Sequence, residues 1–386
     1  MKSVLLVGCG AEIGSSFIGM NQPDNDGFRV GAILTNPIEE NSIHQHLKPI
    51  DSILARIVMA DPSLLDAVTL NYAEGKINIK GQEIPVYFGN CTDYDLSKFG
   101  TRFDATVLAT SKKHIENKKI IGRFSEISDF VVGVSESKQI PALYPNLTGL
   151  PSEIFGRAPK PIGESNIFSI GSCQSNGWHG VLRGLLSSKE RLNLESLEIL
   201  RMEVDIIHPD TPTGRLGTKS VEARSQDPRD NLRPSFSQVP ISMNLLFPNS
   251  INSNTISLRV LTQPPGYQIN RFYFSYRRLN GSRINGDSLR VAFREEASKF
   301  PDYLRMEKIP LGSRGFERCE SGAVILDSNY FFLFYDDPFR LGERAVSQLV
   351  VQSYVHNVRG YCRGLINALK VLFSGQQNYA FYHQSQ

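Results

Sequence analysis

The sequence predicts two domains: an α/β domain with a parallel sheet, followed by a domain built on an antiparallel sheet. The first is indicated by its opening, where an apolar strand (residues 3–7) runs into a glycine-rich turn and a helix. The second is indicated by long strands of alternating polarity beyond residue 166. A chain of 386 residues, 40% of them hydrophobic, is long enough to bury two cores. We expect domains at 1–165 and 166–341, then a C-terminal helix and tail at 342–386.

Composition excludes several classes of protein. The formal charge of +3 is the small difference between 42 basic and 39 acidic residues, and no basic stripe points to nucleic acid. No apolar run is long enough to span a membrane. The five cysteines are scattered without a CxxC pair, which argues against a disulfide framework or a metal site. We expect a soluble, cytoplasmic protein.

The elements of the first domain follow the order of a parallel sheet. A Pro-, Gly- and Asn-rich passage at 137–165 leads out of the domain. Before it we expect strands at 3–7, 28–34, 104–109 and 129–134, helices at 15–20 and 112–124, and a hairpin at 76–80 and 83–88.

The turn after the first strand has the spacing G-x-G-x-x-x-G, from Gly8 to Gly14. Glycines there allow a tight turn and close approach of the backbone to a pyrophosphate at a helix N-terminus. We therefore place a dinucleotide on Gly8, Gly10, Glu12 and Ile13. Asn36 follows the second strand, where an acidic residue would read the ribose; its neutral amide leaves both NAD and NADP open. Thr110 and Ser111, which end a later strand, complete the expected cofactor site.

The second domain and the C-terminal segment contain longer elements. Residues 343–373 are predicted as one long helix, because their apolar residues are spaced mainly by three and four. The other expected elements are strands at 166–170, 197–207, 255–261, 268–277, 322–326 and 330–335, and a helix from 173 to about 187.

Cys173 is the candidate nucleophile. It stands where the strand at 166–170 gives way to the following helix. Unpaired backbone N–H groups and the positive end of the helix dipole favour a thiolate there, and the same donors can hold an oxyanion. A buried cysteine that only fills space is the alternative.

The order of these motifs resembles the glyceraldehyde-3-phosphate dehydrogenase family over nearly the whole chain. The resemblance is carried by Ser172-Cys173-x-x-Asn176, by 258–262 (Leu-Arg-Val-Leu-Thr) and by 334–336 (Phe-Tyr-Asp). It implies a Rossmann-type nucleotide-binding domain, then an antiparallel-sheet catalytic domain, with the C-terminal helix returning to the first. It also implies that Cys173 is the nucleophile and His208 the base. His179, six residues along the helix from Cys173, faces elsewhere and is read as a packing residue.

The resemblance also implies positions that bind substrate. Thr211 and Arg259 match residues that hold the substrate phosphate, and Arg suits that group by its planar fork. Ser172 is retained at the second phosphate site, where Gln174 replaces a threonine and Arg233 offers a different cation. Asp337 takes the place of an asparagine that orients the nicotinamide; a carboxylate there accepts hydrogen bonds and favours the oxidised ring.

Three functions are compatible with these features. The first is an NAD- or NADP-dependent phosphorylating aldehyde dehydrogenase acting on a small phosphorylated aldehyde, with inorganic phosphate as acyl acceptor. The second keeps the cysteine thioester chemistry with another aldehyde or acyl phosphate, as the changes at Gln174, Arg233 and Asp337 suggest. The third is a binding or redox-sensing protein without catalysis. The resemblance further implies a homo-oligomer, either a dimer or a tetramer.

Overall fold

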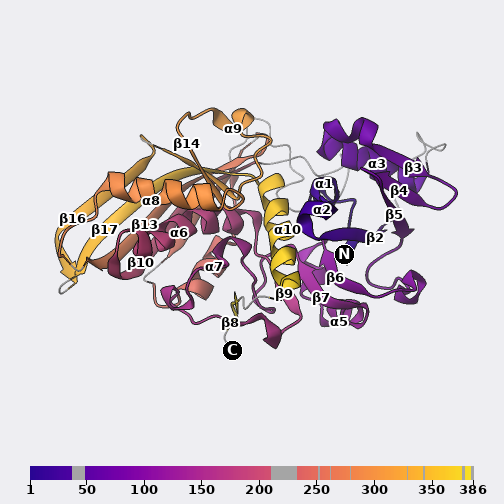
Figure 1. The fold of residues 1–386 in the computed structure, drawn as a ribbon, viewed down its shortest axis with the longest axis horizontal. Helices are drawn as coiled ribbons and strands as arrows, with labels where there is room; N and C mark the ends of the chain where they lie inside the picture. The colour runs from indigo at the N-terminus through magenta and orange to yellow at the C-terminus, as the bar shows by residue number, and fades with distance from the viewer. Residues whose placement is uncertain are drawn as a thin grey trace. The chain divides into compact units, whose positions relative to one another are not determined.

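The computed structural model describes residues 1–36, 48–209, 233–250, 253–260, 262–278, 280–327, 329–341, 344–375 and 379–383. The chain divides into two compact units. Unit 1 comprises Met1–Pro145, Lys160–Gly171 and Leu365–Gln386, and unit 2 comprises Asn146–Pro159 and Ser172–Gly364. Each contains one large sheet, and Figure 1 labels their elements. The fold is therefore mixed α/β, with one mostly parallel and one mostly antiparallel sheet.

The sheet of unit 1 has the order β3-β4-β5-β2-β1-β6-β7-β9. The six strands from β5 to β9 along this order are parallel, and in chain order they stand 3-2-1-4-5-6. β3 and β4 extend the sheet as an antiparallel hairpin beside β5. The bounds are β1 (Lys2–Val7), β2 (Phe28–Thr35), β3 (Val68–Asn71), β4 (Lys76–Ile79), β5 (Gln82–Phe88), β6 (Phe103–Leu108), β7 (Ser128–Gly133) and β9 (Ile167–Ser169).

The parallel sheet of unit 1 includes a strand, β9, that lies later in the chain than the predicted end of the first domain. The strand expected at 166–170 was grouped with the second domain, but β9 pairs in parallel with β7. Its three residues are too few to show the covered-strand pattern that identifies β1 and β6. The pairing partner, rather than the local texture, decides to which sheet such a short strand belongs.

Helices cover the sheet of unit 1. They are α1 (Glu12–Met20), α2 (Pro23–Asp26), α3 (Pro49–Ala60), α4 (Lys112–Ile115) and α5 (Lys118–Ile127). The predicted helix at 112–124 is divided into α4 and α5, because the side chain of Asn117 accepts hydrogen bonds from Lys119 N and Ile120 N and starts a new helix. Between helices and sheet lies an apolar core that includes Leu5, Leu34, Phe103, Phe124 and Val131.

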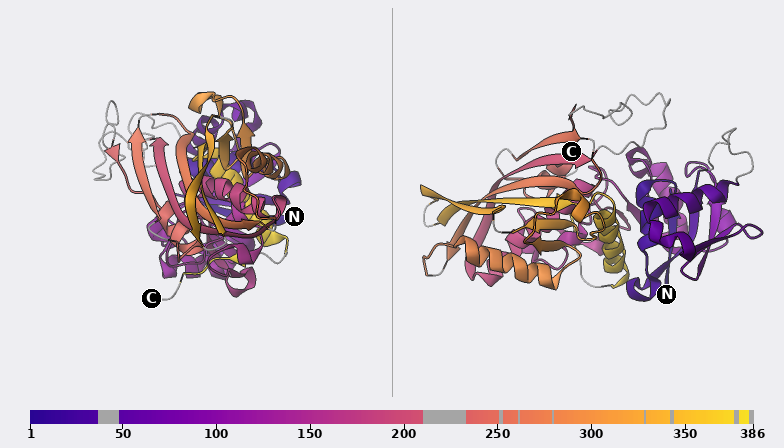
Figure 2. Two further views of the ribbon diagram at one scale, coloured as in Figure 1. Left: turned by 90° about the vertical axis from the view of Figure 1, so that its left-hand side faces the viewer. Right: turned by 90° about the horizontal axis from the view of Figure 1, so that it is seen from above.

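The sheet of unit 2 is mostly antiparallel, with the order β11-β12-β10-β13-β17-β15-β14 and β16 on β17. Figure 2 shows its long strands side by side. β10 and β12 are parallel, as are β14 and β15. The bounds are β10 (Leu194–Pro209), β11 (Arg233–Pro234), β12 (Asn254–Val260), β13 (Gly266–Arg278), β14 (Leu304–Glu307), β15 (Ala323–Leu326), β16 (Phe331–Leu341) and β17 (Arg344–Val355).

Helices α6 (Cys173–Arg191) and α8 (Gly286–Lys299) pack against each other and against the strands of this sheet. α6 is nearly all buried, and its Trp178 stacks on Phe272 of β13 with ring centroids 6.3 Å apart. Glycines allow this close approach: a Cβ at Gly177 would lie 2.3 Å from Val355, and one at Gly184 would lie 2.3 Å from Phe293. The first turn of α6 is thereby held against the end of β17. Two shorter helices complete unit 2, α7 (Val239–Leu246) and α9 (Gly312–Gly315).

The long helix predicted at 343–373 is wrong in its first half. Residues 344–355 form β17, and only Arg359–Phe373 form a helix, α10. Along β17 the residues alternate between buried and partly exposed, from Ser347 to Val355. The sequence contains this period of two, but spacings of three and four coexist with it among so many apolar residues. Pairing with β13 and β16 on its two sides decides the strand.

The last turns of α10 belong to unit 1. There Lys370 Nζ lies 3.1 Å from the buried carboxylate of Asp26, and Phe373 contacts Phe28 edge to face. Further along, β18 (Tyr379–Ala380) pairs with β8 (Lys160–Pro161). The C-terminal residues are thus part of the packing of this unit.

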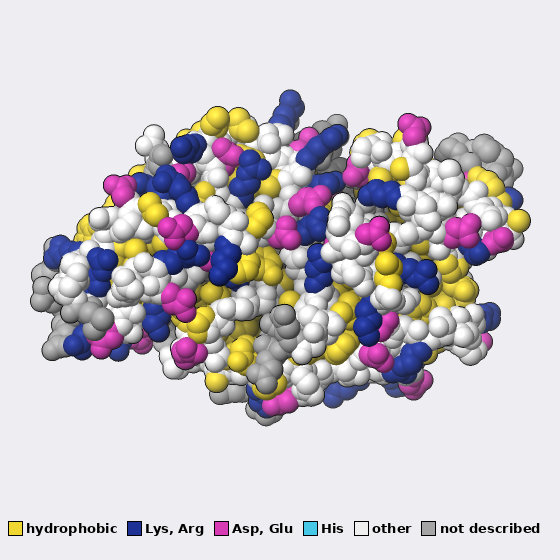
Figure 3. Space-filling model, in the orientation of Figure 1, with side chains coloured by type: hydrophobic (Ala, Val, Ile, Leu, Met, Phe, Trp, Pro, Cys, Tyr) yellow, Lys and Arg dark blue, Asp and Glu magenta, His cyan; other side chains and the backbone are white. Residues whose placement is uncertain are grey.

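Charges of both signs are interspersed over the face drawn in Figure 3, in keeping with the small net charge. Among the described residues, no helix combines the length and apolar character needed to cross a membrane.

His179, in α6, gives the fold a pH dependence. It is fully buried beside Trp178, and this burial lowers the pKa of its imidazole from 6.5 to about 3. Between these pH values the unfolded chain binds a proton that the native protein does not, so stability falls as pH falls through this window. We expect His179→Phe to make the free energy of unfolding less dependent on pH below 6.5. The slope of that free energy with pH should fall by about 1.4 kcal/mol per pH unit. Urea unfolding at pH 8, 6, 5 and 4 measures this. A slope below pH 6 that is the same in both proteins would contradict it.

Candidate active site

Cys173 is the first residue of α6. Ser172 caps the helix with extended backbone (φ −93°, ψ 163°), and its Oγ accepts a hydrogen bond from Ser175 N at 3.1 Å. Cys173 thus stands in the first turn, where backbone N–H groups have no acceptor within the helix. Its side chain is partly exposed, so a small molecule can reach it. Ser172, expected at a substrate phosphate, uses its hydroxyl as a helix cap.

Asn176 fixes the start of α6 from within. Its side chain is buried, and its Nδ2 donates to Gly360 O at 3.4 Å. The backbone carbonyl of Asn176 accepts a hydrogen bond from Asn146 Nδ2 at 2.7 Å. A Cβ at Gly364 would lie 2.7 Å from Asn176 Oδ1, so the two helices approach closely at this point. The asparagine of the Cys-x-x-Asn motif therefore has a positioning role three residues from the thiol.

His208 and Arg259 lie side by side at the ends of two parallel strands. The register of β10 with β12 sets His208 opposite Arg259, and Arg259 Nη1 lies 3.2 Å from His208 Nδ1. His208 Nδ1 is also 2.6 Å from the carbonyl of Pro209. The predicted base and the predicted phosphate-binding arginine are thus brought together by strand pairing.

Asn357 connects Cys173 with His208. It follows β17 and precedes α10, and its Nδ2 lies 3.4 Å from Cys173 Sγ and 3.2 Å from His208 Nε2. Its Oδ1 accepts a hydrogen bond from Gly266 N at 3.1 Å. Because a backbone N–H only donates, this bond requires the oxygen to face Gly266 and the NH₂ group to face the thiol and the imidazole.

The same contacts assign the tautomer of His208. Since the amide NH₂ of Asn357 donates, Nε2 of His208 must accept and carries no proton. The proton then lies on Nδ1, which donates to the carbonyl of Pro209. Arg259 Nη1 also lies within hydrogen-bond distance of Nδ1, and because Arg only donates, its contact competes with the bond to Pro209. In the tautomer that keeps the bonds to Pro209 and Asn357, Nε2 of His208 accepts from the same NH₂ group that contacts the thiol.

Gln174 contacts the sheet of unit 2 through its two oxygen atoms. It is buried, and both its carbonyl and its Oε1 accept from Gln268 Nε2, at 2.9 and 2.7 Å. Gln268 lies on β13 opposite Ile206 of β10, two residues before His208. The glutamine thus joins the first turn of α6 to the sheet. Helix periodicity alone does not reveal this, because the first turn has a face toward the sheet and a face toward solvent.

Asp337 is not brought to Cys173. It lies in β16, between Tyr335, which pairs with Ser347 of β17, and Arg340, which pairs with Ala345. From Ser347 the strand β17 continues for eight residues to Val355, roughly 26 Å at about 3.3 Å per residue. The side chain near the thiol that the sequence assigned to Asp337 is instead an amide, Asn357.

Three further residues were singled out in the part of the sequence that forms unit 2: Arg233, Thr211 and His179. Arg233 lies in β11 opposite Arg259, so its backbone is close to the phosphate-binding candidate. Thr211 lies outside the described residues. His179 is fully buried in α6, as its interpretation as a packing residue requires.

The sequence reasoning missed Asn357 because the predicted helix at 343–373 covered it. Two signals were available: the alternation of 347–355, and the change to helical spacing only after residue 358. Together they place Asn357 at the junction between a strand and a helix, where functional side chains concentrate.

The glycine-rich turn of unit 1 brings the ends of β1, β2 and β6 together. Gly8 N donates to Leu34 O and Ala109 N donates to Val7 O, both at 2.8 Å. Gly8 has φ +95°, and a Cβ on it would lie 2.4 Å from Ala109 O and 3.0 Å from Thr110 Cγ2. Thr110 Oγ1 is buried with no hydrogen-bond partner among the described residues.

The other residues expected at the cofactor lie around this turn. Gly10 N is 3.4 Å from Thr35 Oγ1, at the end of β2, and Asn36 is the exposed residue that follows. Glu12 and Ile13 open α1, whose N-cap residue Ala11 makes no side-chain hydrogen bond. Ser111 is the N-cap residue of α4, after β6.

Replacing Gly14 by alanine is expected to destabilise unit 1. A Cβ at Gly14 would lie 2.4 Å from Gly8 O and 2.9 Å from Cys9 Cα, both rigid backbone atoms, so the turn and α1 have to separate. Overpacking of this kind costs about 1–3 kcal/mol. Gly10→Ala is the matched control, because its Cβ would contact only Thr35 Oγ1, at 3.5 Å. Urea unfolding compares the two, and equal stabilities would contradict this packing.

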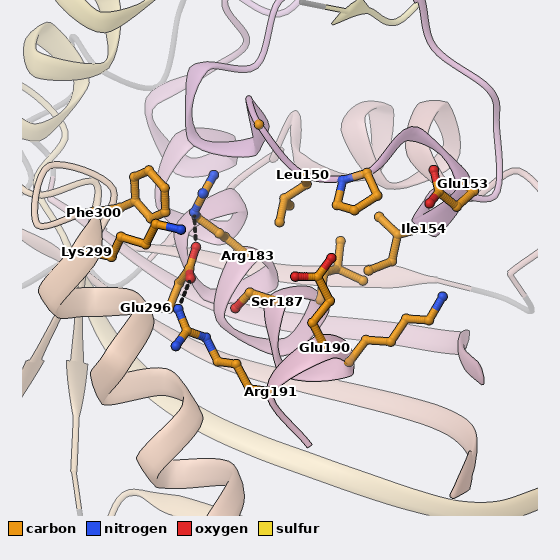
Figure 4. A pocket seen from close by; sticks show the side chains of 14 residues that line it. Leu150, Glu153, Ile154, Arg183, Ser187, Glu190, Arg191, Glu296, Lys299 and Phe300 are labelled. Atoms are coloured by element: carbon orange, nitrogen blue, oxygen red, sulfur yellow. Dashed lines mark hydrogen bonds and ion pairs between the residues drawn. The ribbon is translucent and has the colours of Figure 1, made fainter. Parts of the chain in front are cut away.

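A cavity of about 480 Å³ in unit 2 is separate from these residues. It lies among the loop at 149–154, the C-terminal half of α6 and the end of α8 (Figure 4). Inside it, Glu296 bridges Arg183 and Arg191, at 2.6 and 2.8 Å. Arg183 is buried, donates to Asn146 O and Thr148 O, and stacks on the ring of Phe300 at 3.9 Å. Arg183 is therefore engaged in holding the loop, and Cys173 does not line the cavity.

No protein-family model matches the chain, and a search of curated proteins finds no match.

Proposed function

We propose that the protein is an NAD- or NADP-dependent phosphorylating aldehyde dehydrogenase that forms a thioester on Cys173, similar to glyceraldehyde-3-phosphate dehydrogenase. The observation that carries this is the convergence of Cys173 Sγ and His208 Nε2 on one amide group, that of Asn357. A partly exposed thiol at a helix start, with an unprotonated imidazole nitrogen beside it, suits nucleophilic attack on a carbonyl.

The residues of unit 2 would act in a defined order. Sγ of Cys173 attacks the aldehyde carbon, and the backbone N–H groups of the first turn of α6 stabilise the oxygen that becomes negative. That oxygen takes up a proton to give the thiohemiacetal, whose hydroxyl proton then passes to His208 Nε2, the general base. A hydride would leave the same carbon for the bound nicotinamide cofactor, and an acyl thioester would remain on Sγ. His208, now protonated, is positioned to return its proton as the acyl group is transferred.

Arg259 supports a phosphorylated substrate. Its guanidinium lies 3.2 Å from the ring of His208, so an anion bound to it is held close to the reacting atoms. Arg binds phosphate by two parallel N–H donors, which orients the group as well as attracting it. We therefore propose a small aldehyde with a phosphate group as substrate.

Unit 1 fits a dinucleotide. Its six parallel strands have the order 3-2-1-4-5-6, in which such cofactors bind at the carboxyl end where the order reverses, between β1 and β6. At that point lie Gly8, whose backbone approaches Ala109 closely, and Thr110 Oγ1, which is buried with no hydrogen-bond partner among the described residues. The helix α1 begins directly after this turn, at Glu12. A bound nicotinamide cofactor would supply the hydride acceptor, and Asn36 leaves the choice between NAD and NADP open.

A second candidate keeps the thioester but changes the acyl acceptor. It is favoured by the burial of Gln174, whose two oxygens are occupied by Gln268, and by the use of Ser172 as a helix cap. In these contacts both residues hold the first turn of α6 in place, which is a role other than phosphate binding. The protein would in that case oxidise or reduce a different aldehyde or acyl phosphate in a specialised pathway.

None of the five cysteines forms a disulfide, which fits a reducing compartment, and we propose a cytoplasmic homo-oligomer.

Turnover measurements test the proposal. Phosphorylated and unphosphorylated aldehydes are each offered with NAD or NADP, with and without inorganic phosphate, and reduced cofactor is followed by absorbance. We expect turnover with a phosphorylated aldehyde that depends on phosphate. Turnover without phosphate would favour the second candidate. A protein that binds the cofactor but oxidises no aldehyde would contradict both.

A further inference from the structure

Asn357 lies between the thiol of Cys173 and the imidazole of His208. In a direct Cys–His pair, the sulfur and the ring nitrogen share a proton with no other group between them. The NH₂ group of Asn357 is within hydrogen-bond reach of both reacting atoms, at 3.4 Å from Sγ and 3.2 Å from Nε2. Its oxygen is bound to Gly266 N, so the NH₂ group is the part of the amide that faces the two reacting atoms.

We propose that Asn357 is a positioning residue that sets where the protons of this pair reside. Its N–H groups donate to Sγ and to Nε2, which favours a thiolate on Cys173 and an unprotonated Nε2 on His208. This inference rests on the proposed function only for its use in catalysis. The contacts themselves involve neither aldehyde nor cofactor.

The backbone makes this orientation of the amide the stable one. If the amide turned over, its NH₂ group would face Gly266 N–H, donor against donor, and its oxygen would face Sγ. The bond comes from the backbone of Gly266, the first residue of β13, which pairs with Val355 of β17. Strand pairing two residues away therefore fixes which atom of the amide faces the thiol.

The consequence is a pair that differs from a thiolate–imidazolium ion pair. Hydrogen bonds to a charged group are stronger than those to a neutral one, so donation from Nδ2 favours the thiolate without a proton on His208. Pro209, whose carbonyl accepts from Nδ1, holds the complementary proton. Nε2 then remains available as a base when substrate arrives, which an imidazolium does not provide.

The test is the pH dependence of alkylation of Cys173 by iodoacetamide, a neutral reagent that reacts with the thiolate. The rate at Cys173 is followed by mass spectrometry of its peptide, in wild type and in Asn357→Asp. The substitution is nearly isosteric and retains the bond from Gly266 N, but replaces the NH₂ donor by a carboxylate oxygen. We expect the midpoint of the alkylation profile to rise by at least about one pH unit, which is about a tenfold slower reaction at neutral pH.

Asn280→Asp is the matched control. Asn280 is exposed, and its Oδ1 accepts from Ser282 N and Oγ, as an aspartate oxygen also would. It adds the same charge without contact to the site, so its profile should coincide with that of wild type. A profile of Asn357→Asp that coincides with wild type would overturn the proposal.

A measurement on the unaltered protein covers the case in which Asn357→Asp does not fold. Nitrogen-15 NMR of the histidine rings at pH 7 distinguishes a proton on Nδ1 from one on Nε2. We expect His208 to be neutral with its proton on Nδ1, and a proton on Nε2 would overturn the inference. These experiments need no aldehyde. A shifted alkylation midpoint in a protein that oxidises no aldehyde would therefore refute the proposed function and leave the role of Asn357 standing.

Discussion

Cys173→Ser is expected to lower kcat/KM for aldehyde oxidation by at least roughly 10⁴-fold, the scale on which removal of a covalent nucleophile acts. A serine hydroxyl at the start of α6 retains the shape of the side chain and the helix N-terminus, but it is not ionised at neutral pH and adds poorly to a carbonyl. Steady-state turnover with the best aldehyde found for the wild type measures the loss.

Cys319→Ser is the control for this experiment. Cys319 is also partly exposed and also in unit 2, but it packs beside the apolar cluster of Phe316, Val324 and Leu326. Its replacement should leave turnover unchanged. Turnover that survives in Cys173→Ser would contradict the mechanism.

Glu296→Gln is expected to destabilise the protein by about 3–5 kcal/mol, the range found when one partner of a buried ion pair is removed. Glu296 and Arg183 are both almost completely buried and 2.6 Å apart, and Glu296 also binds Arg191 (Figure 4). Burial lowers the pKa of Arg183, and Glu296 opposes that shift. With glutamine in its place, the guanidinium stays buried without a counter-charge. Urea unfolding at pH 7 measures the change.

Glu295→Gln is the matched control. Glu295 is the adjacent residue, binds Arg191 at 2.6 Å, and has more than half of its side chain exposed. Exposed pairs contribute about 0–1 kcal/mol. Similar losses of stability in the two variants would contradict the assignment of Arg183–Glu296 as the pair that holds α6, α8 and the 146–154 loop together.

Those parts of the fold with a local signal could be predicted from the sequence. A few neighbouring residues suffice to recognise the apolar strands β1 and β6. The same is true of the glycines in the first turn. The cap Ser172 and the helix after it likewise place Cys173 at a helix start. The strand that ends at His208 could be predicted from its alternating residues, whereas the choice of His208 as the base came from the family resemblance.

The rest depends on which strands pair. Residues 344–355 satisfy both a helical and an extended spacing, and only β13 and β16 on their two sides make them a strand. Because of that error, Asn357 is predicted to lie inside a helix, and Asp337 is predicted to occupy the position near the thiol that Asn357 occupies. The orientation of Gln174 and the pairing of Arg183 with Glu296, 113 residues apart, are set by packing between elements. Neither contact can be predicted from the residues that neighbour it in the sequence.

The central claim is that Cys173 carries the acyl group. Protein incubated with oxidised cofactor and a stoichiometric amount of aldehyde, without phosphate, is quenched in acid and analysed by mass spectrometry. The account predicts an increase equal to the acyl group on the peptide that contains Cys173, removed by hydroxylamine and lacking in Cys173→Ser. An acyl group on another residue, or turnover of aldehyde with no acyl group on Cys173 at any time, would contradict it.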